Sequence, residues 1–179
     1  TDTFKTLKET SKIEFLAANV KAPGGLLGSS KIVDIGGVSV GIVGVAEPKG
    51  NGLEVGPALD ALKKEVAELR TKGARVVIAL AAIQRGDALR LVDDLPDLDV
   101  LVVGKPSEKG DGNDQPKPPA MIGQTVVVET SNHLQTVAVV DLHVRDGSFA
   151  FADGTGVERA KKRAELGRRV DELRAKIAS

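Results

Sequence analysis

The sequence of 179 residues contains no cysteine, no tryptophan and no tyrosine. Without cysteine, the chain has no disulfide, thiolate zinc site or c-type haem attachment of its own. Among Phe, Trp and Tyr it contains only four phenylalanines. It therefore offers few aromatic side chains on which nucleotide bases could stack. The core must therefore be built from Val, Leu, Ile and Ala.

A net charge of one sign is also lacking, because 25 Lys and Arg residues balance 25 Asp and Glu residues. We therefore expect no nucleic-acid partner, which a strongly basic chain would attract. No apolar run reaches the roughly 18 residues of a membrane span, and no signal peptide is recognisable. The sequence begins with Thr1 rather than Met, which suggests a fragment or a processed product.

The apolar residues that are present follow a β-α-β-α-β pattern in the middle of the chain. The clearest helix covers residues 57–72, with Pro57 in its first turn and Gly73 after its end. The segments "ARVVIALAA" and "LDVLVVG" are almost unbroken apolar runs, which are typical of strands covered on both faces. With a second helix over 86–94 between them, they predict an α/β fold with a parallel sheet.

Shorter elements surround this unit. Gly36 and Gly37 lie between two apolar runs and predict a hairpin, since both tolerate positive φ. A polar loop is expected over residues 105–120. We divide the chain into an α/β domain over 1–155 and a charged C-terminal helix over 156–179. Periodicity adds helices over 2–11 and 156–177, and strands at "IEFLAANV" (13–20), "TVVVET" (125–130) and "QTVAVVDLHV" (135–144).

The order of five segments is informative: "FLAANV", "IVDIGGVSVGIVGVAEP", "LRTKGARVVIALAA", "LPDLDVLVVG" and "TVVVETSNHLQTVAVVDLHV". In this order and spacing they resemble the 5′-nucleotidase branch of the calcineurin-like metallophosphoesterases. The resemblance covers about residues 5–146 and corresponds to the later part of the family's catalytic domain. It implies that the chain is part of a metallophosphoesterase-like α/β/β/α sandwich.

The resemblance also implies where metal ligands would lie. The family holds two metal ions with Asp, His and Asn side chains, and the pair supplies a metal-bound hydroxide to a phosphate ester. Three later ligands are histidines, and the matching positions here are Ala82, Lys105 and Ser107. None of these supplies an imidazole, and the ammonium of Lys105 would repel a metal pair. We therefore predict no catalytic residue, no metal ligand and no cofactor, and a role as a structural or interaction module.

An alternative remains open. In the family, the first ligands lie in "DxH", "GD" and "GNH" motifs upstream of the "ANV" strand, and this sequence begins after them. A segment upstream of Thr1 could supply them, which would make the chain a fragment of a phosphoesterase that hydrolyses nucleotides with Mn²⁺ or Zn²⁺. Lys105 is a candidate anion-binding residue, since ligands of such sheets bind at the carboxyl ends of strands. The resemblance alone implies a periplasmic or extracytoplasmic setting.

Other motifs carry less chemistry. His133 and His143 are the only histidines, and both are expected on the surface. The "DGND" motif at 111–114 lacks the Gly and Glu of an EF-hand loop. The glycines of "GGLLGSS" and "GGVSVG" do not open a helix after a strand, so they do not form a dinucleotide fingerprint.

The C-terminal helix is rich in charge, with eight basic and four acidic residues between 157 and 179. Acidic residues recur every seven positions, and each precedes Lys or Arg by four residues, an arrangement that favours ion pairs. A short heptad-like seam follows Arg159 and Arg163 and consists of Leu166, Val170, Leu173 and Ile177. We predict that this seam contributes to association, with docking on its own domain or linking to a following one as alternatives.

The sheet gives a second reason to expect association. If the earlier half of the family's fold is absent, strands such as "VVIALAA" would leave an apolar face uncovered. We therefore predict a homodimer, or contact with a further domain of the same polypeptide.

Overall fold

The structure is a computed structural model that describes residues 2–11, 13–48, 53–104, 115–131, 136–144, 147–152 and 154–178. The main sheet consists of β2 (Ser30–Ile35), β3 (Val38–Ala46), β5 (Val76–Ala82), β6 (Val100–Val103), β7 (Lys117–Ile122) and β8 (Thr125–Glu129). Its strand order is β2-β3-β5-β6-β8-β7. The inner strands β3, β5, β6 and β8 are parallel, and the edge strands β2 and β7 are antiparallel to their neighbours. The parallel sheet predicted from the sequence is confirmed.

Helices α2 (Ala58–Thr71) and α3 (Arg85–Asp93) cover one face of the sheet and confirm both predicted central helices. Alternation along the strands places Val43, Ala79 and Leu101 in one row on that face, with no exposed surface. Burying a side chain of the size of Leu stabilises the fold by about 1.5–3 kcal/mol. The helices contribute apolar residues at helical spacing, namely Leu62, Val66, Leu69, Ala88, Leu91 and Val92.

The opposite face of the sheet is only partly covered. Leu80 is 42% exposed, and Ile78 on the same face of β5 is half-buried. At the amino end of β5, the guanidinium of Arg75 lies over the ring of Phe149, with 4.1 Å between Cζ and the ring centroid. Segment 147–152 therefore lies beside the amino end of β5, and the apolar surface around Leu80 stays open.

The predicted hairpin at Gly36 and Gly37 is confirmed. The two glycines join β2 to β3 with φ values of 61° and 83°, which residues with a Cβ rarely adopt. Asp34 Oδ1 accepts a hydrogen bond from Gly37 N at 3.0 Å and holds the turn.

Gly44 in β3 marks the place where the N-terminal segment approaches the sheet closely. Ala18 N donates a hydrogen bond to Gly44 O at 2.7 Å. A Cβ added to Gly44 would collide with the backbone carbonyl of Leu16. This approach therefore requires glycine.

Three sequence predictions are wrong. The strand expected over 13–20 is limited to β1 (Val20–Lys21), which pairs with β4 (Glu54–Val55). The loop expected over 105–120 includes the first residues of β7. The strand expected over 135–144 is not formed in its described part, residues 136–144.

The missing strand has a physical explanation. Val137 and Val139 are 86% and 78% exposed, although their alternation with smaller residues favours a strand. The preference of valine for strands reflects packing on a neighbouring strand and on a covered face. Residues 136–144 have neither in the structure, so the sequence pattern alone does not produce a strand.

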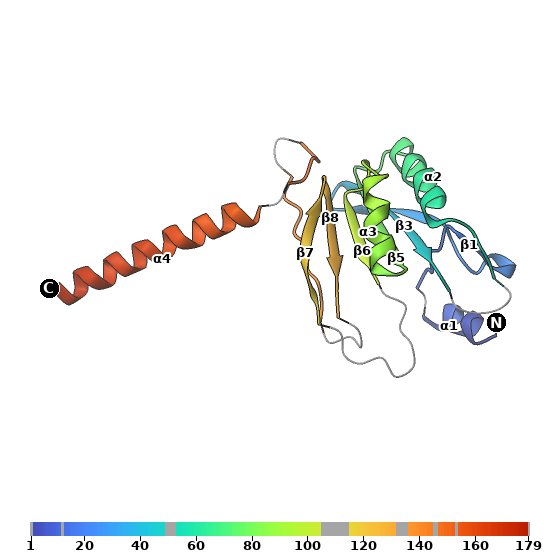
Figure 1. Cartoon of the computed structure of the whole chain (residues 1–179), viewed down its shortest axis with the longest axis horizontal. Helices are drawn as coiled ribbons and strands as arrows, with labels where there is room; N and C mark the ends of the chain where they lie inside the picture. The colour runs from blue at the N-terminus through green and yellow to red at the C-terminus, as the bar shows by residue number, and fades with distance from the viewer. Residues whose placement is uncertain are drawn as a thin grey trace.

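The terminal helices are confirmed as α1 (Asp2–Ser11) and α4 (Thr155–Ala178). Helix α4 projects away from the sheet (Figure 1). Its side chains from 162 to 177 are all exposed. Among the helices of the described residues, none has the length and apolarity needed to cross a membrane.

Candidate functional site

The carboxyl edge of the sheet, where the parallel strands end, is the usual place for a ligand in an α/β fold. Ala46 and Ala82 end β3 and β5 and lie side by side in the register of the sheet. Gly104 follows the end of β6, and its N donates a hydrogen bond to Ala81 O at 2.9 Å. Two of these adjacent strands therefore end in alanine, and the third is followed directly by glycine.

Ala82 is exposed at this edge. Its carbonyl accepts a hydrogen bond from Glu47 N at 3.1 Å, so the backbone oxygen is engaged as well. The position that the resemblance assigns to a histidine ligand thus carries a methyl group. Lys105 and Ser107, the other two assigned positions, lie outside the described residues.

Asn19 is a polar residue of this edge to which the sequence analysis gave no role. It is 6% exposed, and its Nδ2 donates hydrogen bonds to Ala46 O at 2.9 Å and Gly56 O at 3.1 Å. Its Oδ1 accepts a hydrogen bond from Ala46 N at 2.9 Å. The two bonds to Ala46 fix the end of β3, and the bond to Gly56 joins that end to the segment that follows β4. A single amide among the apolar residues of "FLAANV" was the signal that could have revealed this role.

An ion pair lies at the same end of the sheet, on the side of the helices. Arg85 begins α3, and its Nε donates to Glu129 Oε2 at the end of β8 at 2.6 Å. The side chain of Glu129 is only 16% exposed. The carboxylate is therefore neutralised by a guanidinium rather than available to a cation. No local sequence pattern predicts this pair, because 44 positions separate the two residues.

The described residues do not fit a dinuclear metal centre. No three His, Asp or Glu side chains gather within the part of the chain that the structure describes. Every buried side-chain nitrogen and oxygen in that part has a hydrogen-bond partner. The polar side chains of Asn19 and Glu129 at this edge are both engaged by protein atoms.

The remaining candidate motifs do not assemble a site. His143 is exposed, as predicted, although it does not lie in a strand. His133 and the "DGND" motif at 111–114 fall outside the described residues.

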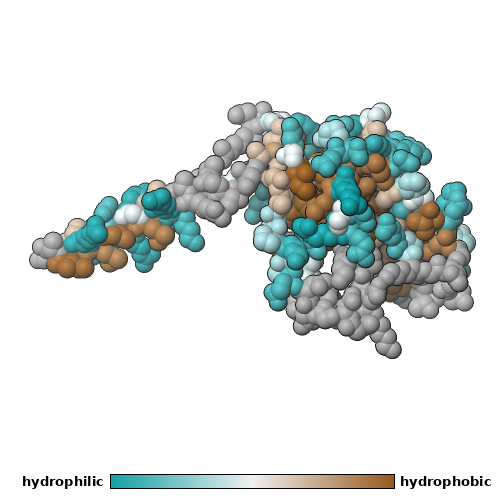
Figure 2. Space-filling model, viewed as in Figure 1, coloured by the Kyte–Doolittle hydropathy of each residue, from teal (hydrophilic) through white to brown (hydrophobic). Residues whose placement is uncertain are grey.

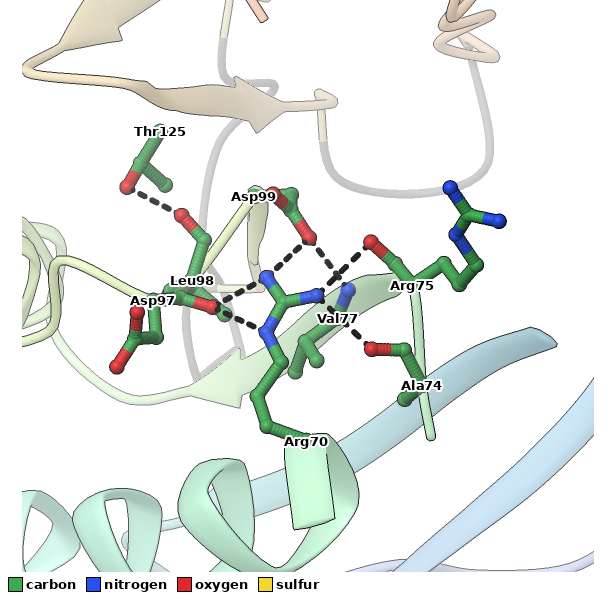
Figure 3. Close-up of polar contacts among 8 residues, drawn as sticks. All are labelled: Arg70, Ala74, Arg75, Val77, Asp97, Leu98, Asp99 and Thr125. Atoms are coloured by element: carbon green, nitrogen blue, oxygen red, sulfur yellow. Dashed lines mark hydrogen bonds and ion pairs between the residues drawn. The ribbon is translucent and has the colours of Figure 1, made fainter. Parts of the chain in front are cut away.

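The opposite edge, where the parallel strands begin, carries a polar network centred on Arg70 of α2 (Figure 3). Arg70 Nη2 donates to Asp99 Oδ2 at 2.7 Å and to Asp97 O at 2.6 Å. Nη1 donates to Ala74 O at 3.1 Å and to Arg75 O at 2.8 Å. One guanidinium thus joins the end of α2 to the segments that precede β5 and β6.

The acidic partner of this network is also bound to the sheet. Asp99 Oδ2 accepts a hydrogen bond from Val77 N in β5 at 2.6 Å. Beside it, Thr125 Oγ1 at the start of β8 donates to Leu98 O at 2.7 Å (Figure 3). The network therefore has a structural role, because its charges are matched and its bonds end on the protein itself.

The seam predicted on α4 is exposed to solvent, and Figure 2 shows apolar residues along one side of this helix. The exposed fractions are 55% for Leu166, 45% for Val170, 53% for Leu173 and 85% for Ile177. The alternative in which the seam docks on its own domain is therefore not what the structure shows.

No protein-family model matches the chain, and no curated protein matches it. Solved structures do. The NAD nucleotidase NadN of Haemophilus influenzae is 18% identical with a TM-score of 0.53, over 70% of this chain and 31% of NadN. A 5′-nucleotidase precursor from Thermus thermophilus is 22% identical with a TM-score of 0.52, over 72% of this chain and 29% of the precursor.

The sulfate thiohydrolase SoxB of Thermus thermophilus is 20% identical with a TM-score of 0.56, over 72% of this chain and 25% of SoxB. The chain thus spans between a quarter and a third of these proteins. Likeness at this level of identity concerns the fold. The chain has the mixed α/β fold of part of a 5′-nucleotidase-like metallophosphoesterase structure, which confirms the resemblance predicted from the sequence.

Proposed function

We propose that the chain is a non-catalytic module with a 5′-nucleotidase-like fold, which acts through structure or interaction. The observation that carries this proposal is the exposed methyl group of Ala82 at the carboxyl end of β5. Metal-assisted ester hydrolysis needs lone-pair donors that hold the ions where the ester binds. An alanine supplies none, and its neighbours Ala46 and Gly104 add none.

The test is metal analysis of the purified chain together with phosphomonoesterase and nucleotide-hydrolysis assays in added Mn²⁺ or Zn²⁺. We expect no tightly bound metal and no turnover. Because no turnover is expected, neither of two variants should change the result of the assay. Ala82→Leu would block this edge, and the control Ala67→Leu lies on the exposed face of α2. Two equivalents of tightly held metal, or turnover that Ala82→Leu abolishes and Ala67→Leu spares, would contradict the proposal.

A second candidate function is that of a metal-dependent phosphoesterase fragment acting on nucleotides. It is supported by the names of the similar structures, two of which are nucleotidases and one a thiohydrolase, and by the partial coverage of each. In this case, residues encoded upstream of Thr1 would hold Mn²⁺ or Zn²⁺. Reading the gene in that direction distinguishes the two candidates. A "DxH", "GD" and "GNH" series favours the enzyme, and its absence favours the module.

The proposed module associates through the open face of the sheet. The surface around Leu80 includes half-buried apolar residues of four neighbouring strands: Ile42, Ile78, Val102 and Val126. Twofold pairing would bury the same patch on both copies. A further domain of the same polypeptide could cover it instead.

Sedimentation equilibrium at several concentrations tests the homodimer. We expect a dimer that Leu80→Arg converts to a monomer. The control Val55→Arg changes a residue of β4 with the same exposed fraction, 42%, outside the main sheet, and should leave the dimer intact. A monomer at all concentrations would exclude the homodimer and favour the further domain.

A further inference from the structure

Helix α4 presents its apolar residues in a narrow line. Leu166, Val170, Leu173 and Ile177 follow one another at spacings of four, three and four residues. At 3.6 residues per turn, this spacing keeps them on one side of the helix over three turns. Each is at least 45% exposed. The structure therefore holds an apolar stripe that the described part of the chain leaves uncovered.

The charges of α4 are divided around this stripe. Successive residues turn by about 100° around the helix axis, so four basic residues flank the stripe on its two sides and Arg163 continues its line at the amino-terminal end. The acidic residues of the same stretch, Glu165, Asp171 and Glu172, lie farther round the helix. The flanking residues are Lys162, Arg169, Arg174 and Lys176, all exposed.

This charge pattern disfavours pairing of α4 with a second copy of itself. In a parallel pair of helices, the positions that flank the seam meet across it, which would set Arg169 of one copy against Arg174 of the other. In an antiparallel pair, basic flanks again face basic flanks. Like charges at such positions act against a pairing. The helix that covers the stripe therefore does not carry basic residues at its own flanking positions, as α4 does.

The width of the stripe favours a helix over a membrane surface. A stripe of two residues per heptad is the narrow seam of a coiled coil, whereas a helix that lies in a membrane interface buries a broader apolar face. Between 155 and 178 the helix has no aromatic residue that could anchor it at such an interface.

We propose that α4 binds an acidic amphipathic helix. Apolar seam residues of that partner pack on Leu166, Val170, Leu173 and Ile177, and its flanking Asp or Glu residues face Arg169 and Arg174. An acidic residue of its seam lies opposite Arg163, where the apolar stripe ends. This inference rests on the proposed role as an interaction module and specifies its partner. It is independent of the chemistry at Ala82.

The experiment measures binding of labelled synthetic helices of three heptads to the full chain by fluorescence anisotropy. One peptide has Ile and Leu in its seam and Glu at the flanking positions. A second has Lys at the flanks, and a third has Ser in the seam. We expect binding of the first peptide alone, because only it matches both the stripe and its charges.

Matched variants locate the contact. Arg169→Glu should weaken binding of the Glu peptide about fivefold or more, because it replaces attraction by repulsion beside the stripe. Arg168→Glu makes the same charge change on the opposite side of α4 and should leave binding within about twofold. Circular dichroism shows whether both variants keep their helix.

Three results would overturn the proposal. The first is equal binding of the Glu and Lys peptides, or equal effects of Arg169→Glu and Arg168→Glu. The second is binding to phosphatidylglycerol vesicles without binding to the Glu peptide, which would assign the stripe to a lipid surface. The third is a dimer that Leu173→Ala dissociates, which would assign it to a second copy. Absence of phosphoesterase activity would remain a separate result in each case.

Discussion

Removing the guanidinium of Arg70 is the sharpest test of how the sheet and its helices are held together. Arg70→Ala would leave Asp99 without its cation and would remove the guanidinium donor from the backbone oxygens of Ala74, Arg75 and Asp97, while Asp99 Oδ2 would keep its bond from Val77 N. The side chains of Arg70 and Asp99 are 27% and 12% exposed, so water only partly replaces these bonds. Hydrogen bonds to charged groups contribute about 1.5–3 kcal/mol each, and breaking a buried pair costs about 3–5 kcal/mol. Allowing for partial hydration, we expect a loss of about 2–4 kcal/mol.

The assay is urea unfolding followed by far-ultraviolet circular dichroism, because the chain has no Trp or Tyr for fluorescence. With a slope of about 2 kcal/mol per molar urea, the midpoint should fall by about 1–2 M. Helix α4 adds to this signal, so hydrogen exchange at the amide of Val77 gives a local readout. That amide is bonded to Asp99 and should exchange faster in the variant.

Two pairs of variants test whether the network of Arg70 and Asp99 stabilises the fold. Arg90→Ala removes an exposed ion pair on α3 and should cost less than about 0.5 kcal/mol. Asp99→Asn keeps an acceptor for Val77 N and should destabilise less than Asp99→Ala. The network would not be a stabilising element if Arg70→Ala cost no more than Arg90→Ala. The role given to Asp99 would be wrong if its two variants unfolded alike.

Two further changes test the packing of the sheet. Gly44→Ala should cost about 1–3 kcal/mol in urea unfolding, because its Cβ meets the carbonyl of Leu16, whereas Gly86→Ala in α3 has open space and should be neutral or stabilising. Equal effects would show that the N-terminal segment does not lie against β3. Leu101→Ala should cost about 2–5 kcal/mol, because the side chain is fully buried, and Leu80→Ala on the open face should cost much less. If Leu80→Ala lowered the free energy of unfolding as much as Leu101→Ala does, the face of the sheet around Leu80 would be covered.

Local pattern was sufficient for the elements whose residues repeat with a clear period. The helix predicted over 57–72 is α2, and the apolar runs on either side of residues 86–94 are β5 and β6. The two glycines at 36 and 37 located a hairpin, since the turn depends on their own backbone freedom. The order of these segments also indicated the metallophosphoesterase-like fold, at the level that the solved structures support.

Local pattern failed where pairing with another strand decides the outcome. Residues 136–144 have the composition of a strand and form none, because a strand requires a neighbour. Lys117 begins β7 despite the prolines that follow it, because an edge strand can leave one side of its backbone unpaired.

The sequence by itself determined that the position matched to a histidine ligand is Ala82, and that α4 carries an apolar line preceded by two arginines. It did so because residue identity and helical spacing are local properties. Only the tertiary structure decided that Asn19 fixes the end of β3, that Glu129 is held by Arg85, and that the stripe of α4 faces solvent. These facts depend on which segments far apart in the chain come into contact. A local sequence pattern does not determine such contacts.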